Sequence, residues 1–456
     1  MAPAAGDVAW VLASAALVML MTPGLAFFYG GMVRAGSVLN MLMMNVVCIA
    51  VVGLVWVVCG FGIAFGHDSF RGLVGGAGDI GLQQAITGFV GFASTDPALP
   101  WPGLNPLPTL AFAMFQLMFA IITPALISGA VAERTRFWPW VVFVAVWSVV
   151  VYAPVAHWVF AADGFLAPDA VGGWIVNELG AADFAGGTVV HMNAGAAALA
   201  LAIVLGRRHG WPASVPRPHN VPFTLLGASL LWFGWYGFNA GSALAANAVA
   251  ALAFTNTTVA TCAAILGWLL VEQFRTGRPT TLGAASGAVA GLVAITPACG
   301  FVDPWGAIAI GVIGGAGCAL ACSLKWRLGL DDSLDVVAIH LIGGLFGTLL
   351  VGVFAAPAVN PGYAGEAGLL YGGDATQLTR QAIAAGVVGL YSFLATLVIG
   401  YLIRFTIGFR VRRESEVRGV DEYEHAETAY ELGPTAFSGL YGTEPGRHSA
   451  PDGRMV

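Results

Sequence analysis

The chain has 456 residues, of which 58% are hydrophobic and only 10% are charged, with a formal net charge of −6. Soluble domains carry about 25% charged residues, so most of this chain is not built to face water. The sequence has one lysine, Lys325, and no basic stripe, which excludes a nucleic-acid-binding protein. The composition therefore predicts an integral membrane protein.

Long apolar segments set the predicted helices, since a helix needs about 20 mainly apolar residues to span a bilayer. In chain order, such segments lie at about 8–31, 38–65, 107–131, 137–160, 185–206, 221–240, 247–273, 280–297, 304–325, 336–356 and 381–409. The first segment has no basic residue before it, and its apolar run ends at Pro23 and Gly24. It is therefore expected to remain as a helix rather than to be cleaved as a signal peptide.

Basic residues predict the orientation, because cytoplasmic loops carry an excess of Arg and Lys. With eleven spans, 17 of the 19 Lys and Arg residues fall on the side of the membrane that holds the C-terminus. The two on the other side are Arg71 and Arg380. The N-terminus is thus expected outside and the C-terminus in the cytoplasm. The predicted organisation is a membrane domain over residues 1–409, followed by a cytoplasmic tail over 410–456.

Two predicted spans combine an aspartate near one end with a histidine deeper in the helix. Asp183 precedes His191 in the fifth span, and Asp335 precedes His340 in the tenth. Each pair ends a block of five spans, and successive blocks have opposite topology, as in an inverted repeat. The expected fold class is an all-α integral membrane protein with eleven transmembrane helices, in which two five-helix inverted repeats are followed by one extra helix.

The two histidines are the main functional candidates, because ionisable groups inside a membrane are costly. A single such histidine is as often structural, but two at matching positions favour a pore lining. Imidazole has an unperturbed pKa of about 6.5 and both donates and accepts hydrogen bonds, which suits proton exchange. Asp183 and Asp335 are expected to cap their helices. The fixed charge of Asp183 also favours a cation nearby.

Two other classes of membrane protein are alternatives to a pore. A retinal pump needs an intramembrane lysine, whereas Lys325 lies at a helix end. A haem protein with His191 and His340 as axial ligands stays open, and visible absorbance would decide it. The six cysteines include no CxxC pair and are interpreted as small hydrophobic residues. We expect no metal site, no cofactor and no enzyme activity.

An ordered set of stretches resembles the Amt/Mep/Rh ammonium transporter family, and specifically its bacterial Amt branch. The matching stretches run nearly end to end and are Pro23–Gly31, Ile122–Ile127, Ala132–Arg134, Asp183–His191, Gly237–Ser242, Asp331–His340, Gly419–Asp421 and His425. The string Asp-Phe-Ala-Gly-Gly-Thr-Val-Val-His at 183–191 and the second histidine are the most specific of these.

The resemblance implies a homotrimer in the bacterial plasma membrane, with one pore per subunit for ammonium uptake and no cofactor. Ammonium would bind at an outer site, lose its proton, and cross as ammonia. The implied residues are Phe119, Phe160, Ser242 and Asp183 for the outer site, Phe119 and Phe238 for a gate, and His191 and His340 for the pore. A PII-type signalling protein is the expected cytoplasmic partner. An ammonium sensor with little flux is the alternative function.

Phe160 departs from the family pattern, in which the outer aromatic residue is commonly Trp. Phe is a weaker cation–π partner than Trp. We therefore expect weaker recruitment of ammonium than in relatives that carry Trp. Trp158 lies two positions away and is expected to face elsewhere.

Overall fold

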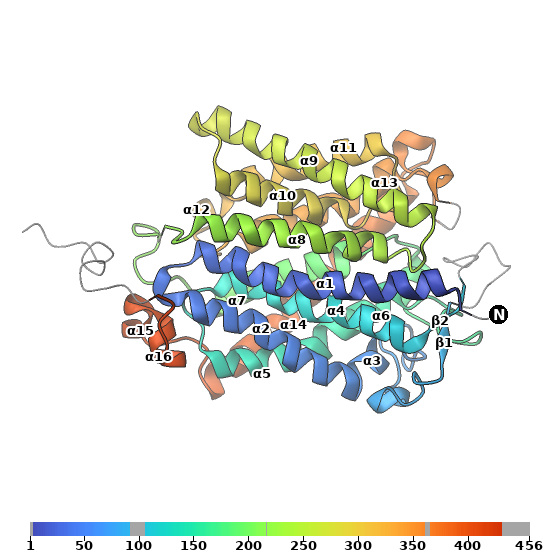
Figure 1. Ribbon diagram of the computed structural model, residues 1–456, viewed down its shortest axis with the longest axis horizontal. Coiled ribbons are helices and arrows are strands. Elements are labelled where there is room, and N and C mark those ends of the chain that lie inside the picture. The colour runs from blue at the N-terminus through green and yellow to red at the C-terminus, as the bar shows by residue number, and fades with distance from the viewer. Residues whose placement is uncertain (1–2, 92–104, 216, 361–364, 431–456) are drawn as a thin grey trace, which may run out of the picture.

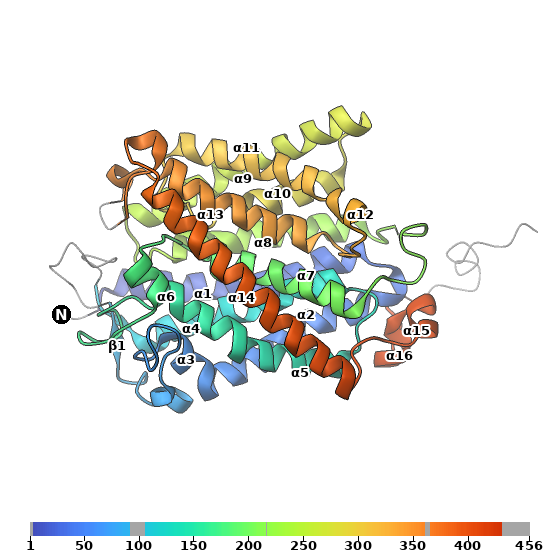
Figure 2. The ribbon, with the colours of Figure 1, turned by 180° about the vertical axis from the view of Figure 1, so that it is seen from behind.

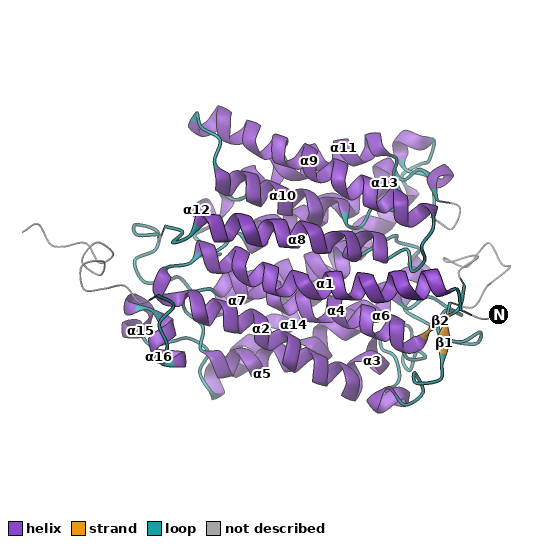
Figure 3. Cartoon of the chain, viewed as in Figure 1, coloured by secondary structure: helices purple, strands orange, loops and turns teal. Residues whose placement is uncertain are grey.

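The computed structural model describes residues 3–91, 105–215, 217–360 and 365–430, and this part of the chain is almost entirely helical (Figures 1 and 3). Its long helices lie side by side along the longest axis of the molecule. Among the described residues, the only sheet is one short antiparallel pair, β1 (Phe89–Val90) and β2 (Leu107–Pro108). The predicted all-α class is confirmed.

Ten helical runs in the described residues are long and apolar enough to cross a membrane. Four of them contain or begin with a π-helical turn. The runs are α1 (Ala5–Met32); α2 (Val38–Val55) and α3 (Phe61–Phe65) around the turn Trp56–Gly60; α4 (Thr109–Ile127); α5 (Phe137–Trp147) and α6 (Ala153–Phe160) around the turn Ser148–Tyr152; α7 (Asn193–Leu205) after the turn Gly187–Met192; α8 (Val221–Gly241); α9 (Ala248–Thr276); α11 (Pro304–Ala321) with α12 (Leu324–Leu328); α13 (Gly343–Phe354) after the turn Val337–Ile342; and α14 (Thr376–Thr406).

These ten runs match ten of the predicted segments to within five residues at every boundary. The remaining segment, predicted at 280–297, forms α10 (Thr281–Ile295), which has 15 residues and is shorter than the others. The structure therefore supports about ten membrane-spanning helices by length and composition, and the eleventh stays a prediction.

The two ends of the described chain lie at opposite ends of the bundle (Figure 1). We call them the N-terminal end and the tail end; the tail end carries α15 (Arg413–Arg418) and α16 (Val420–His425). Seen from behind, α14 crosses the bundle diagonally, and it packs on α5, α7 and α13 (Figure 2).

Helices α1 and α8 pack closely along each other, and they are the first helices of the two predicted five-helix blocks. A Cβ atom added to Gly227 in α8 would lie 2.2 Å from the backbone nitrogen of Phe28 in α1. Only glycine fits there, which is the close backbone approach that small residues permit between membrane helices.

The tail is attached through carboxylates that cap helices of the bundle. Asp421 accepts hydrogen bonds from the backbone N–H groups of Leu39 and Asn40 at 3.0 and 2.8 Å, at the start of α2. Glu424 accepts one from the N–H of Phe137 at 2.9 Å, at the start of α5. Helix starts have free amides and the positive end of the dipole, so both carboxylates stabilise the docked tail. The rest of the predicted tail, residues 431–456, lies outside the described residues.

A buried ionic network joins the loops of the tail end. Glu133 accepts hydrogen bonds from Arg34 Nε and from Arg208 Nη1, both at 3.0 Å. Burial alone would raise the pKa of Glu133, but the two guanidinium groups outweigh it and hold this pKa below its ordinary value. Asp331 pairs with Arg208 at 2.8 Å. The loops after α1, α4, α7 and α12 are thereby tied into one layer.

Candidate functional site

A small aromatic pocket lies where the N-terminal end of α4 meets the ends of α6 and α8. Its volume is about 30 Å³, and its walls are Phe112, Phe115, Gln116, Phe119, Phe160, Phe165, Phe184, Ser242 and Leu244. Three of the four residues predicted for an outer site, Phe119, Phe160 and Ser242, therefore share one pocket. Its size suits a single small molecule, and aromatic side chains are the kind that attract a cation.

Ser242 and Gln116 are the two polar side chains of this pocket. The Ser242 hydroxyl donates to the carbonyl oxygen of Phe238 at 2.8 Å, so its oxygen lone pairs remain free to accept. Gln116 is 8% exposed, and its Oε1 has no hydrogen-bond partner among the described residues. An unpaired buried carbonyl oxygen costs about 1–3 kcal/mol, and a donor in the pocket would remove that cost.

The sequence alone did not assign a role to Gln116. It lies three residues before Phe119, and residues at this spacing share a helix face. The spacing of Gln116 and Phe119 could therefore have indicated that Gln116 lies beside the predicted gate.

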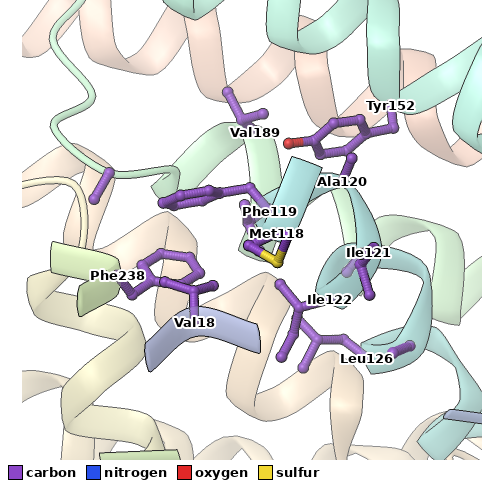
Figure 4. Close-up of a cluster of buried hydrophobic side chains, with 14 of the residues drawn as sticks. Val18, Met118, Phe119, Ala120, Ile121, Ile122, Leu126, Tyr152, Val189 and Phe238 are labelled. Atoms are coloured by element: carbon purple, nitrogen blue, oxygen red, sulfur yellow. The ribbon is translucent and has the colours of Figure 1, made fainter. Parts of the chain in front are cut away.

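Phe119 and Phe238 form a contact directly below the pocket, and Figure 4 shows their rings side by side. Their ring centroids lie 4.4 Å apart and the planes are tilted by 46°. Both side chains are buried, with Val18 and Ile122 nearby. The predicted convergence of these two rings is thus present in the structure.

His191 and His340 meet on the other side of Phe238. Their Nδ1 atoms lie 3.3 Å apart, and the His191 ring stacks on Phe238 with centroids 5.8 Å apart and on Trp235 at 5.4 Å. A hydrogen bond between two Nδ1 atoms needs one donor and one acceptor, so at least one imidazole of the pair is neutral. The Nε2 atom of His191 is buried without a partner among the described residues.

A cavity of about 10 Å³ adjoins the two histidines, and apart from them its walls are apolar side chains and Trp235. That volume has no room for a porphyrin, so the geometry rejects the haem interpretation of His191 and His340. No cluster of three or more metal-ligating side chains is found in the described part of the chain.

Asp183 does not line the aromatic pocket. Its carboxylate caps the turn that carries His191, accepting from the backbone N–H groups of Gly186, Gly187 and Thr188 at 2.7–2.8 Å and from the Thr188 hydroxyl at 2.5 Å. All of these contacts are local, so the predicted capping role of Asp183 is present. Any effect of Asp183 on a cation must act through its fixed charge rather than by direct contact.

The predicted cap at Asp335 is wrong. Asp332 caps the turn that carries His340, accepting from the N–H groups of Val336 and Val337 at 3.1 and 2.7 Å. Asp335 instead pairs with Lys325 at 2.8 Å. In both halves the capping aspartate therefore precedes the histidine by eight residues. Burial first, and the neighbouring Asp335 second, raise the pKa of Asp332 to about 6.

Trp158 faces away from the pocket, as predicted. Its Nε1 donates to the carbonyl oxygen of Leu73 at 2.7 Å, and its ring packs on Tyr391 with centroids 4.8 Å apart. It cannot replace the ring that Phe160 contributes.

Comparisons with known proteins agree along nearly the whole chain. The Ammonium Transporter Family model matches residues 9–430. The ammonium transporter of Mycobacterium tuberculosis H37Rv is 56% identical over 464 residues, which cover 99% of this chain and 95% of that protein. The ammonium transporter of Bacillus subtilis 168 is 46% identical over 427 residues, with 93% and 98% covered.

Two solved structures show the same fold. The crystal structure of Candida albicans Mep2 has a TM-score of 0.79 and 33% identity, over 90% of this chain and 87% of that chain. A structure described as a sensor Amt protein also has a TM-score of 0.79, with 31% identity over 92% and 98%.

A bundle of apolar spanning helices around a buried line of aromatic rings and histidines is typical of a membrane transport protein. The chain belongs to the ammonium transporter family, and it is a multi-pass protein of the plasma membrane. The predicted resemblance is confirmed.

The cap assignment predicts unequal effects of two matched substitutions. Asp332→Asn places an amide NH₂ against a backbone N–H and loses an acceptor, which should cost about 1 kcal/mol and lower the thermal midpoint by a few degrees. Asp335→Asn removes only a partly exposed ion pair and should change the midpoint less. Thermal unfolding of the detergent-solubilised protein checks this. A larger loss for Asp335→Asn would contradict the assignment.

Phe160→Trp is expected to strengthen ammonium recruitment, because Trp offers a more negative ring face than Phe. A gain of about 0.7 kcal/mol would lower the half-saturating ammonium concentration about threefold. Initial transport rates over a series of ammonium concentrations measure it. An unchanged apparent affinity, with the maximal rate retained, would show that Phe160 does not face the recruited cation.

Proposed function

We propose that this protein moves ammonium by binding the cation in the aromatic pocket, removing its proton, and passing ammonia along the two histidines. One observation carries the proposal: the pocket and the histidine pair are separated only by the rings of Phe119 and Phe238. The polar groups that would bind the substrate and accept its proton thus lie one after another along a single buried line.

Recruitment rests on the chemistry of the pocket walls. An ammonium ion has four N–H donors and one positive charge. The phenylalanine faces attract the charge, and the oxygens of Ser242 and Gln116 accept two of the donors. Asp183 adds negative charge from behind the pocket, since its oxygens are occupied by the helix start.

Ammonium is expected to lose its proton because the passage beyond the pocket is lined by apolar side chains. The passage past Phe119 and Phe238 is apolar, and moving an intact cation through such a medium is costly. Neutral ammonia avoids most of that cost once the two rings part. The histidine pair supplies donors and acceptors in an otherwise apolar segment. As the rings part, the N–H bond of ammonium breaks, its proton passes to the neutral imidazole of the pair, and ammonia remains.

The topology belongs to the same proposal. Ten crossings would return the chain to the end where it started, whereas its two described ends lie at opposite ends of the bundle. This supports α10 as an eleventh crossing. The packing of α1 on α8 and the matched caps at Asp183 and Asp332 support two inverted repeats. We place the N-terminus outside and the tail end in the cytoplasm.

Assembly and partners are proposed from the resemblance to the ammonium transporter family. A homotrimer with one pore per subunit is the expected assembly, with residues 1–409 as the membrane domain and 410–456 as a regulatory tail. A PII-type protein is the proposed partner at the tail end, where residues 410–430 cap α2 and α5.

A sensor with little flux is the second candidate. It is favoured by the similarity to the structure described as a sensor Amt protein. It is also consistent with the contact between Phe119 and Phe238, which closes the path. Binding in the aromatic pocket is common to both functions, so flux separates them.

The test is current on a solid-supported membrane after an ammonium pulse, with the wild type beside the His191→Ala/His340→Ala variant. An electrogenic, histidine-dependent transporter gives wild-type currents that disappear or lose ammonium selectivity in the double variant. Wild-type binding of ammonium without current or flux would favour the sensor. Equal, selective currents in both proteins would overturn the proposed role of the histidines.

Gln116→Met keeps the approximate shape of the side chain but removes its strong acceptor. Loss of a hydrogen bond to a cation should raise the half-saturating ammonium concentration about 10-fold. Methylammonium has one N–H fewer, so its apparent affinity should fall less, and the ratio between the two substrates is the internal control. If both affinities change equally or not at all, Gln116 does not contact the cation.

A further inference from the structure

A larger hollow lies at the tail end, between the loop after α7 and the start of the tail. Its volume is about 300 Å³, and four arginines, a histidine and a glutamate carry its charge: Arg207, Arg208, Arg410, Arg413, His209 and Glu416. We call this hollow the basic pocket. It lies at the opposite end of the bundle from the aromatic pocket and takes no part in the proposed transport path.

Two of these arginines are already neutralised. Arg208 pairs with Glu133 and Asp331 in the buried network. Arg410 pairs with Glu416 at 2.7 Å, and the same carboxylate accepts from the backbone N–H of His209 at 2.5 Å. Glu416, the one acidic side chain of the pocket, therefore already has partners and does not neutralise the other arginines.

The other two arginines have no carboxylate partner among the described residues. Arg207 donates through Nε to the carbonyl oxygen of Gly329 at 2.8 Å, and its guanidinium lies 5.0 Å from the ring of Trp211. Arg413 Nη2 lies 3.1 Å from His209 Nε2, which must accept because arginine only donates. Among the described residues, no hydrogen-bond partner is found for the Nη groups of Arg207 or for Nε and Nη1 of Arg413, so these groups can bind a ligand.

The excess of arginine at this end agrees with a cytoplasmic location, but topology alone does not bring like charges to the walls of one hollow. Unpaired guanidinium groups at close range repel each other unless an anion lies between them. Guanidinium is also the side chain that binds phosphate oxygens through paired N–H donors.

We propose that the basic pocket binds a phosphate group, which bridges Arg207 on the loop after α7 and Arg413 on α15. A volume of about 300 Å³ exceeds that of phosphate alone, which leaves room for the rest of a phosphate-bearing molecule, either a soluble phosphoester or an anionic lipid headgroup. The bridge holds α15 against the loop after α7, the helix that follows the π-helical turn carrying His191.

Hydrogen exchange of the full-length protein in phosphatidylcholine nanodiscs tests the proposal. The probe is inorganic phosphate, compared with chloride at matched ionic strength, and the readout is exchange in the amides of residues 410–425. The variant is Arg207→Gln/Arg413→Gln. The matched control is Arg275→Gln/Arg278→Gln, which removes two exposed arginines at the end of α9, outside the pocket.

Phosphate is expected to slow exchange in the wild type and the control, while the double variant needs about 10-fold more phosphate for the same effect. An unchanged thermal midpoint shows that the double variant is folded. Slow exchange in phosphatidylglycerol nanodiscs without phosphate identifies a lipid headgroup, and protection only on adding phosphate identifies a soluble ligand. A wild-type response equal to that in chloride, or an equal response in the double variant, overturns the proposal.

Discussion

The hydrogen bond between His191 and His340 joins the two halves of the bundle at their centre, and the placement of both side chains depends on how two helices begin. Each histidine lies in a π-helical turn whose free amides are bound by an aspartate eight residues earlier, Asp183 or Asp332. The turn that carries His340 also approaches α7 closely, since a Cβ on Gly195 in α7 would lie 2.3 Å from the backbone nitrogen of Leu341. The aspartate caps fix the direction in which the two helices begin, and Gly195 permits their close approach.

Under the proposed function, the distribution of polar groups around that centre would let one chain recruit a cation and still exclude it from the bilayer interior. Acceptor oxygens are present in the aromatic pocket, at Gln116 and Ser242, and are replaced by the rings of Phe119 and Phe238 one step deeper. Polar atoms return only at the histidines. In the proposed mechanism, a charged substrate is therefore stabilised at the entrance and penalised beyond it, which favours loss of the proton before the histidines are passed.

Helix positions could be predicted from the sequence because the need for about 20 apolar residues is local and strong. The cap at Asp335 was predicted wrongly because three aspartates, Asp331, Asp332 and Asp335, crowd the same helix start. Counting eight residues back from His340, as from His191, would have selected Asp332. Selecting Asp332 requires that the two halves be aligned on their histidines, and not on the aspartate nearest to each histidine.

Other features depend on tertiary contacts that no local pattern contains. The sequence places Gln116 in an apolar run, but only the folded bundle shows that its oxygen is buried without a partner beside Phe160 and Ser242. The capping of α2 by Asp421 joins residues more than 380 positions apart. The convergence of Phe119 and Phe238 was inferred from a family resemblance, whereas composition and periodicity could not supply it.

The central claim is that the line from the aromatic pocket to the histidines carries flux, and isotope-labelled ammonium uptake into proteoliposomes tests it most directly. Wild-type protein should give saturable uptake well above that of empty liposomes. Narrowing the path with Ile122→Trp, beside the Phe119 and Phe238 contact, should abolish uptake while ammonium still binds at the pocket. Uptake by the wild type that does not exceed empty liposomes, or that persists in a folded Ile122→Trp variant, would contradict the account.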